Sequence, residues 1–139
     1  MKVEAIHVRA PDETEVREVG VVDAIAGKGL DGDRYFFADG ARPGLALTLI
    51  EGDVVRGAGL EPGSTHRQVT VTGAGLNDLV GKKFRVGSVE CYGVMLCEPC
   101  LHLQELTRPG IIDDLVHRGG LNADILTTGT IAVGDEVVV

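Results

Sequence analysis

The stretch Arg67-Gln68-Val69-Thr70-Val71-Thr72, followed by Gly73-Ala74-Gly75, sets the pattern for the whole chain. Polar and apolar residues alternate from Gln68 to Thr72, which predicts a β-strand with one buried face. The glycines that follow end the strand in a turn. The chain holds 20 glycines, about twice the usual share, without a collagen-like period. Many short strands joined by tight turns explain that number.

Similar patterns recur on both sides of this stretch. They predict strands at residues 2–10, 45–50, 83–86, 88–96, 121–126 and 137–139. Helical spacing is confined to short segments at residues 51–55, 76–81, 99–106 and 109–117. Residues 19–26 are mixed, and residues 130–136 are predicted as a turn before the last strand.

These elements predict a mainly β fold with two or three short helices. We expect a closed or partly closed β-barrel, because closure removes exposed strand edges. No internal repeat and no linker rich in Pro, Gly or Ser interrupts residues 1–139, so the sequence predicts a single domain.

Charge and composition narrow the function classes. The formal net charge of −8 argues against sequence-independent binding of nucleic acid or of an anionic membrane, which needs a basic surface. No run of about 18 apolar residues predicts a transmembrane helix, and the first residues show no signal-peptide pattern. Three cysteines in such a chain predict free thiols in a reducing cytoplasm.

The reactive side chains gather in Cys97-Glu98-Pro99-Cys100-Leu101-His102. The C-x-x-C spacing serves a redox dithiol, one working thiol, or half of a zinc site that would need His102 and one of Cys91, His117 or His66. A single working thiol at Cys100 is favoured, because a helix is predicted to begin there and a helix N-terminus favours the thiolate. Cys91 and Cys97 are interpreted as small, buried, apolar residues.

Three arginines are candidates for binding an anion, because each lies beside a glycine or at the start of a predicted strand. Arg34 follows Asp31-Gly32-Asp33, Arg67 begins the strand predicted at residues 67–72, and Arg118 precedes Gly119-Gly120. The guanidinium fork suits phosphate and carboxylate. The two aspartates before Arg34 allow a cation site, but the simpler interpretation is a glycine turn in which Asp33 accepts backbone hydrogen bonds.

Six short motifs stand in a specific order along nearly the whole chain. They are Gly32-Asp33-Arg34, Arg67-Gln68-Val69-Thr70, Leu79-x-Gly81 with Phe84-x-Val86-Gly87, Pro99-Cys100-x-x-Leu103, Arg118-Gly119-Gly120-Leu121-x-Ala123, and Gly129-x-Ile131-x-Val133-Gly134-Asp135-x-Val137. In this order they resemble the MOSC domain, the C-terminal module of molybdenum cofactor sulfurases, which also occurs as free-standing bacterial proteins.

The resemblance implies a β-barrel and a functional cysteine after the proline, Cys100. That cysteine would carry sulfur as a persulfide or bind the molybdenum of a pterin cofactor. Arg34, Arg67 and Arg118 would face the cofactor phosphate, with Thr70 as a hydrogen-bond donor. The family is also associated with pyridoxal phosphate, which in the full sulfurases belongs to a separate desulfurase domain; the six motifs of this chain match only the MOSC module.

Three hypotheses follow. In the first, the protein handles molybdenum cofactor or sulfur through Cys100, with a cysteine desulfurase or a molybdenum enzyme as partner and with any catalytic activity depending on that partner. In the second, it is a non-catalytic module that binds the molybdenum cofactor or a related anionic pterin. In the third, it is a small structural zinc protein.

Overall fold

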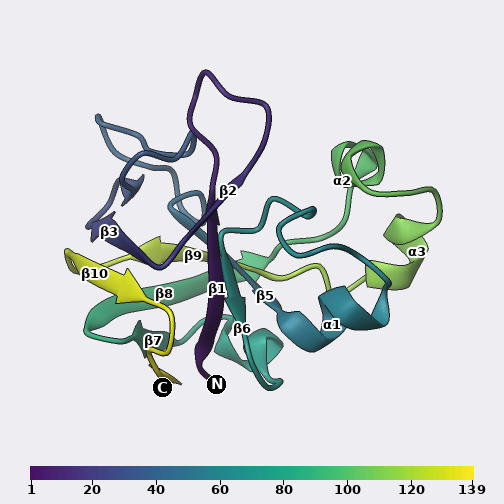
Figure 1. Ribbon diagram of the computed structural model, residues 1–139. Helices are drawn as coiled ribbons and strands as arrows, with labels where there is room; N and C mark the ends of the chain where they lie inside the picture. The colour runs from purple at the N-terminus through teal and green to yellow at the C-terminus, as the bar shows by residue number, and fades with distance from the viewer.

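The computed structural model describes residues 1–139, and its framework is an eight-stranded sheet curved into an open half-barrel (Figure 1). The strand order is β11-β7-β8-β9-β5-β6-β1-β2. In chain order these strands are β1 (Val3–Val8), β2 (Arg17–Val19), β5 (Leu47–Glu51), β6 (Val69–Val71), β7 (Lys83–Val86), β8 (Val89–Leu96), β9 (Leu121–Ile125) and β11 (Val137–Val138).

A second, smaller sheet in the order β10-β3-β4 completes the strands. It contains β3 (Val21–Ile25), β4 (Gly29–Leu30) and β10 (Gly129–Ala132). The prediction of a mainly β, closed or partly closed barrel is confirmed in its partly closed form, because the edge strands β2 and β11 do not pair with each other and the barrel stays open. The two chain ends nevertheless lie side by side in Figure 1, where Val137 N–H donates to the Met1 carbonyl at 2.8 Å.

The core lies against the sheets and is almost entirely aliphatic. Its main cluster holds 22 buried residues, with Phe84 as the one aromatic ring and Cys91 as the one thiol. Burial of this apolar surface is the main source of stability for the half-barrel.

One parallel strand pair positions the site. β5 and β6 run parallel, joined by α1 (Gly52–Gly57), whereas the other pairs in the sheets are antiparallel. Leu49 pairs with Val69, so Thr48 and Gln68 lie next to each other just before that pair. This places the start of the β6 segment, with Arg67, beside the start of β5.

The remaining helices are short. They are η1 (Leu76–Leu79), a 3₁₀ turn, α2 (Leu101–Leu106) and α3 (Ile111–Leu115). α2 and α3 pack on each other at one side of the sheet (Figure 1) through a small buried cluster of Leu103, Ile111 and Leu115. We call residues 97–120, which contain both helices, the flank.

Two local predictions were wrong. Residues 129–132 form strand β10 rather than a turn, because they pair with β3, and neither strand alternates clearly enough on its own. α3 is shorter than residues 109–117, because Gly110 lies at φ 85° before the helix and His117 at φ 61° after it, both outside helical geometry.

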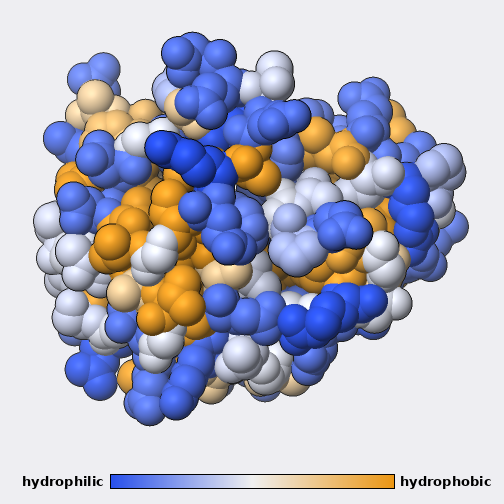
Figure 2. All heavy atoms as spheres, viewed as in Figure 1, coloured by the Kyte–Doolittle hydropathy of each residue, from blue (hydrophilic) through white to orange (hydrophobic).

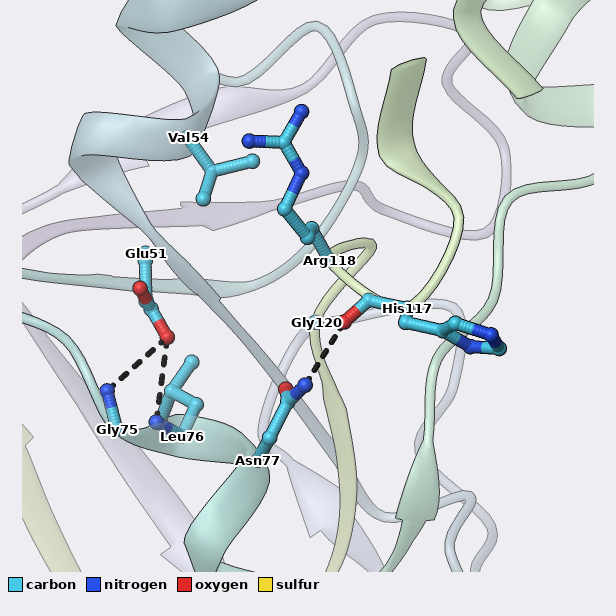
Figure 3. Close-up of a pocket in the computed structure, with 8 residues that line it drawn as sticks. All are labelled: Glu51, Val54, Gly75, Leu76, Asn77, His117, Arg118 and Gly120. Atoms are coloured by element: carbon cyan, nitrogen blue, oxygen red, sulfur yellow. Dashed lines mark hydrogen bonds between the residues drawn. The ribbon is translucent and has the colours of Figure 1, made fainter. Parts of the chain in front are cut away.

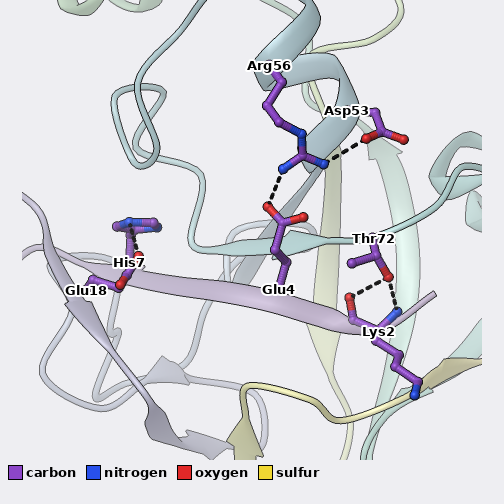
Figure 4. A network of polar contacts seen from close by, with 7 residues as sticks. All are labelled: Lys2, Glu4, His7, Glu18, Asp53, Arg56 and Thr72. Atoms are coloured by element: carbon purple, nitrogen blue, oxygen red, sulfur yellow. Dashed lines mark hydrogen bonds and ion pairs between the residues drawn. The ribbon is translucent and has the colours of Figure 1, made fainter.

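Polar contacts tie the outer elements to β1 (Figure 4). Arg56 of α1 donates to Glu4 at 2.9 Å and to Asp53 at 2.7 Å. His7 is buried on β1, with its Nε2 3.3 Å from the Glu18 carboxylate. Burial lowers the pKa of His7, and Glu18 acts in the opposite direction.

The surface is neither uniformly hydrophobic nor uniformly hydrophilic. On the face drawn in Figure 2, hydrophobic atoms gather mostly over the sheet side, and hydrophilic atoms cover most of the rest. None of the helices has the length and apolar content needed to cross a membrane.

Candidate functional site around Cys100

A cavity of about 240 Å³ opens between the sheet and α2, and we call it the thiol cavity. Loops on the sheet side and the segment before α2 supply most of its walls. Its 14 lining residues are Arg34, Tyr35, Gly44, Leu45, Thr48, Thr65, His66, Arg67, Cys97, Glu98, Cys100, His102, Leu106 and Asn122. The structure therefore brings together three of the residues singled out in the sequence, Cys100, Arg34 and Arg67.

Cys100 is exposed and stands at the N-cap of α2 in an extended conformation, with φ −141° and ψ 177°. Its carbonyl accepts the Gln104 N–H at 3.0 Å, which begins the helix. Its thiol makes no capping hydrogen bond and is free to react. The predicted helix start after Cys100 is confirmed, and the six residues of the helix limit the influence of its dipole on the thiol.

The other two thiols differ from Cys100 in burial. Cys91 is fully buried on β8, and burial raises its pKa to about 12. Cys97 is half-buried; burial raises its pKa, with Arg67 acting in the opposite direction. The interpretation of Cys91 as a core residue is confirmed, and Cys97 shares the thiol cavity with Cys100.

Arg67 fastens the flank to the sheet through backbone carbonyls. Its Nε donates to the Gly119 carbonyl at 2.8 Å, and its two terminal nitrogens donate to the carbonyls of Cys97 at 3.2 Å and Thr65 at 3.4 Å. No carboxylate pairs with it. Arg67 therefore positions the segment before Cys100 while leaving its positive charge without a counterion.

Gly119 makes this fastening possible. A Cβ at position 119 would stand 2.3 Å from the Cys97 carbonyl oxygen and 3.2 Å from the Pro99 ring. Only glycine allows the chain after α3 to pass so close to the segment that carries Cys100.

Arg34 supplies a second unneutralised cation. Its guanidinium lies over the Tyr35 ring, with Cζ 4.4 Å from the ring centroid, and it forms no ion pair. Such stacking holds the guanidinium without neutralising it. The thiol cavity is thus locally basic in a chain whose net charge is −8.

A network of buried hydrogen bonds lies next to the residues that line the thiol cavity. Asp33, 4% exposed, accepts the backbone N–H groups of Arg9 at 2.8 Å and Tyr35 at 3.1 Å, as the glycine-turn interpretation predicted. It also accepts the Gln68 side-chain amide at 2.7 Å. Gln68 in turn accepts the Thr48 N–H at 2.9 Å, so one network joins the Arg34 loop, β5 and the start of β6.

His66 is a site residue that the sequence analysis did not single out beyond a possible zinc ligand. Its backbone has φ 59°, which is uncommon for a residue with a side chain, and its Nδ1 is buried without a partner. Burial lowers its pKa, and Arg34, Arg9 and His102 lower it further, against the opposing effect of Asp33. In the sequence, only its position directly before Arg67 could have indicated that His66 belongs to the site.

Glu98 links the segment before Cys100 to the turn after α3. Its carboxylate accepts the His117 N–H at 2.7 Å and lies 2.7 Å from the His117 Nδ1. The backbone hydrogen bond is the main reason that the pKa of Glu98 is lowered.

Two predicted site residues lie elsewhere. Thr70 is buried on β6 and lines a small hollow with Glu4 and Arg56. Arg118 lines a different cavity, whose residues do not overlap with those of the thiol cavity. No group of three or more His, Cys, Asp or Glu side chains is placed to hold a metal ion, so the ligand set considered for zinc is not assembled.

Solved structures share this fold. YuaD from Bacillus subtilis superposes with a TM-score of 0.78 at 16% identity, covering 98% of this chain and 93% of that one. YiiM from Geobacillus stearothermophilus (TM-score 0.67, 17% identity) covers 99% and 73%, and YiiM from Escherichia coli (0.68, 16%) covers 100% and 70%. At such identities the likeness shows the fold alone. No protein-family profile and no curated protein sequence matches the chain.

Proposed function

We propose that this chain is a MOSC-type protein that handles sulfur or molybdenum cofactor through Cys100. The observation that carries the proposal is the shared cavity, which is lined by Cys100, an exposed cysteine, and by two arginines that have no carboxylate partner. The fold shared with YuaD and YiiM is consistent with a MOSC-like architecture. A cysteine desulfurase or a molybdenum enzyme is the proposed partner.

In the sulfur-carrier form of the proposal, Cys100 accepts sulfur from a cysteine persulfide on the partner. The Cys100 thiolate attacks the outer sulfur, the partner's S–S bond breaks, and the partner cysteine leaves as a thiolate. Cys100 then holds the sulfur as a persulfide. Arg34 and Arg67 would stabilise the anionic forms of the thiol and of the persulfide.

The residues also fit the anionic end of a molybdenum cofactor. Arg34 and Arg67 would hold its phosphate, and Cys100 would supply a thiolate ligand; when bound, the cofactor would supply redox chemistry at molybdenum. The volume of about 240 Å³ lies below the usual range of roughly 300–1,000 Å³ for small-molecule pockets. The cavity therefore fits part of the cofactor rather than all of it.

The test is intact-mass and metal analysis of gently purified protein, before and after incubation with a cysteine desulfurase and cysteine. A mass increase of about 32 Da that maps to Cys100 marks the persulfide, and bound molybdenum with a pterin marks the cofactor form. Cys100→Ala should abolish whichever signal is found. Wild-type levels in that variant would refute the proposal.

Iodoacetamide labelling provides the matched control for thiol reactivity. With its pKa raised to about 12, about one Cys91 thiol in ten thousand is ionised at pH 8, so Cys91 should stay unlabelled while the fold is intact. Cys100 should be labelled at least about a hundredfold faster. Equal rates would show that Cys100 is not the accessible thiol.

The unpaired arginines favour a second candidate, a binding module without sulfur chemistry. In that case Arg67→Ala should weaken binding of a phosphorylated pterin, and alkylation of Cys100 should leave binding unchanged. Loss of binding on alkylation would favour the first proposal.

A further inference from the structure

The cavity that contains Arg118 is a second potential binding site. It has a volume of about 230 Å³ and is bounded by the end of β5, α1, the start of η1 and the turn after α3 (Figure 3). Its lining residues are Glu51, Val54, Gly75, Leu76, Asn77, His117, Arg118 and Gly120. We call it the Arg118 cavity.

Two opposite charges border this cavity without pairing to each other. One Glu51 oxygen accepts the N–H groups of Gly75 at 3.3 Å and Leu76 at 3.2 Å, and its second oxygen has no partner. One terminal nitrogen of Arg118 donates to the Asp114 carbonyl, and its other nitrogens have no partner. Figure 3 shows the carboxylate and the guanidinium projecting from different walls.

The other walls leave room for an apolar group and one more polar contact. Val54 and Leu76 are aliphatic, and Leu76 is fully buried. The Asn77 amide nitrogen donates to the His117 carbonyl at 2.8 Å, which leaves its oxygen available as an acceptor. The His117 ring points away from Glu51 and Arg118 in Figure 3, and its Nδ1 lies 2.7 Å from the Glu98 carboxylate.

From this arrangement we propose that the Arg118 cavity binds a small zwitterion, such as a free α-amino acid. The ligand carboxylate would bind the free nitrogens of Arg118, and its ammonium group would donate to the free oxygen of Glu51 and to the Asn77 oxygen. A simple anion would meet the charge of Glu51, and a simple cation that of Arg118, so a ligand with both charges is favoured.

The size of the cavity agrees with this class of ligand. At roughly 30 Å³ for each water displaced, about 230 Å³ corresponds to some seven or eight waters, which suits a ligand with a similar number of heavy atoms. The ligand side chain would lie against Val54, which is partly exposed.

The test is an NMR titration of the ¹⁵N-labelled full chain with glycine, L-alanine and L-leucine. The amide signals of Gly75 and Leu76 report directly on Glu51, because they donate to it. We expect saturable shifts of these signals in the millimolar range. Acetate and methylammonium, which each carry half of the zwitterion, should give no saturation at the same concentrations.

Variants that remove one charge each separate binding from structure. Arg118→Gln and Glu51→Gln should each weaken the amino-acid affinity roughly tenfold or more, because each removes one charge-assisted contact. A glutamine at position 51 still has an oxygen that can accept the η1 amides, so the fold should persist. Arg85→Gln on β7, outside the cavity, should leave the affinity unchanged.

Two results would overturn the proposal. The first is the absence of saturable shifts with all three amino acids. The second is an unchanged affinity in Arg118→Gln, which would place any binding elsewhere. Neither result bears on the thiol cavity, because the two cavities share no lining residue.

Discussion

The sheet core and the flank are stabilised in different ways. The hydrophobic cluster of the core holds 22 buried residues, whereas that of the flank holds three, Leu103, Ile111 and Leu115. Polar contacts hold the rest of the flank, through Arg67 to two carbonyls, Glu98 to His117, and Arg108 to Asp114 at 2.7 Å. The exposed thiol thus stands on the part of the molecule that depends least on apolar burial. Opening of the flank should cost less than unfolding of the sheet.

The largest expected effect on the free energy of unfolding comes from truncating a large side chain in the core. Phe84→Ala removes a ring that is 2% exposed and should lower the free energy of unfolding by about 3–5 kcal/mol. Leu103→Ala is a smaller truncation in the flank and should cost about 2 kcal/mol, at the lower end for Leu→Ala substitutions, because its small cluster can relax. Urea unfolding measures both. Equal losses would contradict the distinction between the two regions.

Much of this division could be predicted from the sequence. Alternation and glycine turns located β1, β5 to β9 and β11, and Pro109 marked the start of the α3 region, because these signals are local. The β3–β10 pair was missed, since it joins distant parts of the chain, with Ala24 opposite Gly129, and neither strand shows a clear period. Pairing over such distances is decided by tertiary contacts.

The site was only partly predictable for the same reason. Cys100 was found from its predicted helix start, Arg34 from its glycine turn and Arg67 from its predicted strand start, and they line one cavity. The placement of Arg118 in another cavity follows from the close passage of Gly119 by Cys97, which no local pattern reveals. The Gln68–Asp33 contact likewise joins residues 35 positions apart.

A smaller and more local effect is expected for Arg67. Arg67→Ala removes two hydrogen bonds to carbonyls of the flank, those of Gly119 and Cys97, and should lower the local stability of residues 97–120 by about 1–3 kcal/mol. Hydrogen exchange should rise in the flank and stay unchanged in β7 and β8. Arg67→Lys keeps the charge but not the fork, so it should restore anion affinity better than flank protection. A uniform rise across the sheet would argue against a local role.

The smallest expected effect depends on pH. Hydrogen bonds from His117 lower the pKa of Glu98, so their stabilisation is fully present above the unfolded-state pKa of about 4.3 and is lost as the pH falls through the lower folded-state pKa. The difference in urea midpoint between wild type and Glu98→Gln should therefore be present at pH 7 and vanish in acid.

Glu105→Gln provides the control for this effect. Glu105 is exposed on α2 and makes no side-chain hydrogen bond or ion pair. Its substitution should leave the urea midpoint close to that of wild type at neutral pH. A loss as large as that of Glu98→Gln would mean that the general loss of a negative charge, rather than the contact with His117, is responsible.

The close passage of Gly119 by Cys97 has a consequence for protein engineering. Even a methyl group at position 119 would press on the Cys97 carbonyl, which is the same oxygen that Arg67 holds. A saturation library at this position should therefore return glycine alone wherever selection demands an intact thiol cavity. Residue 119 fixes the shape of the site without contributing a single side-chain atom to it.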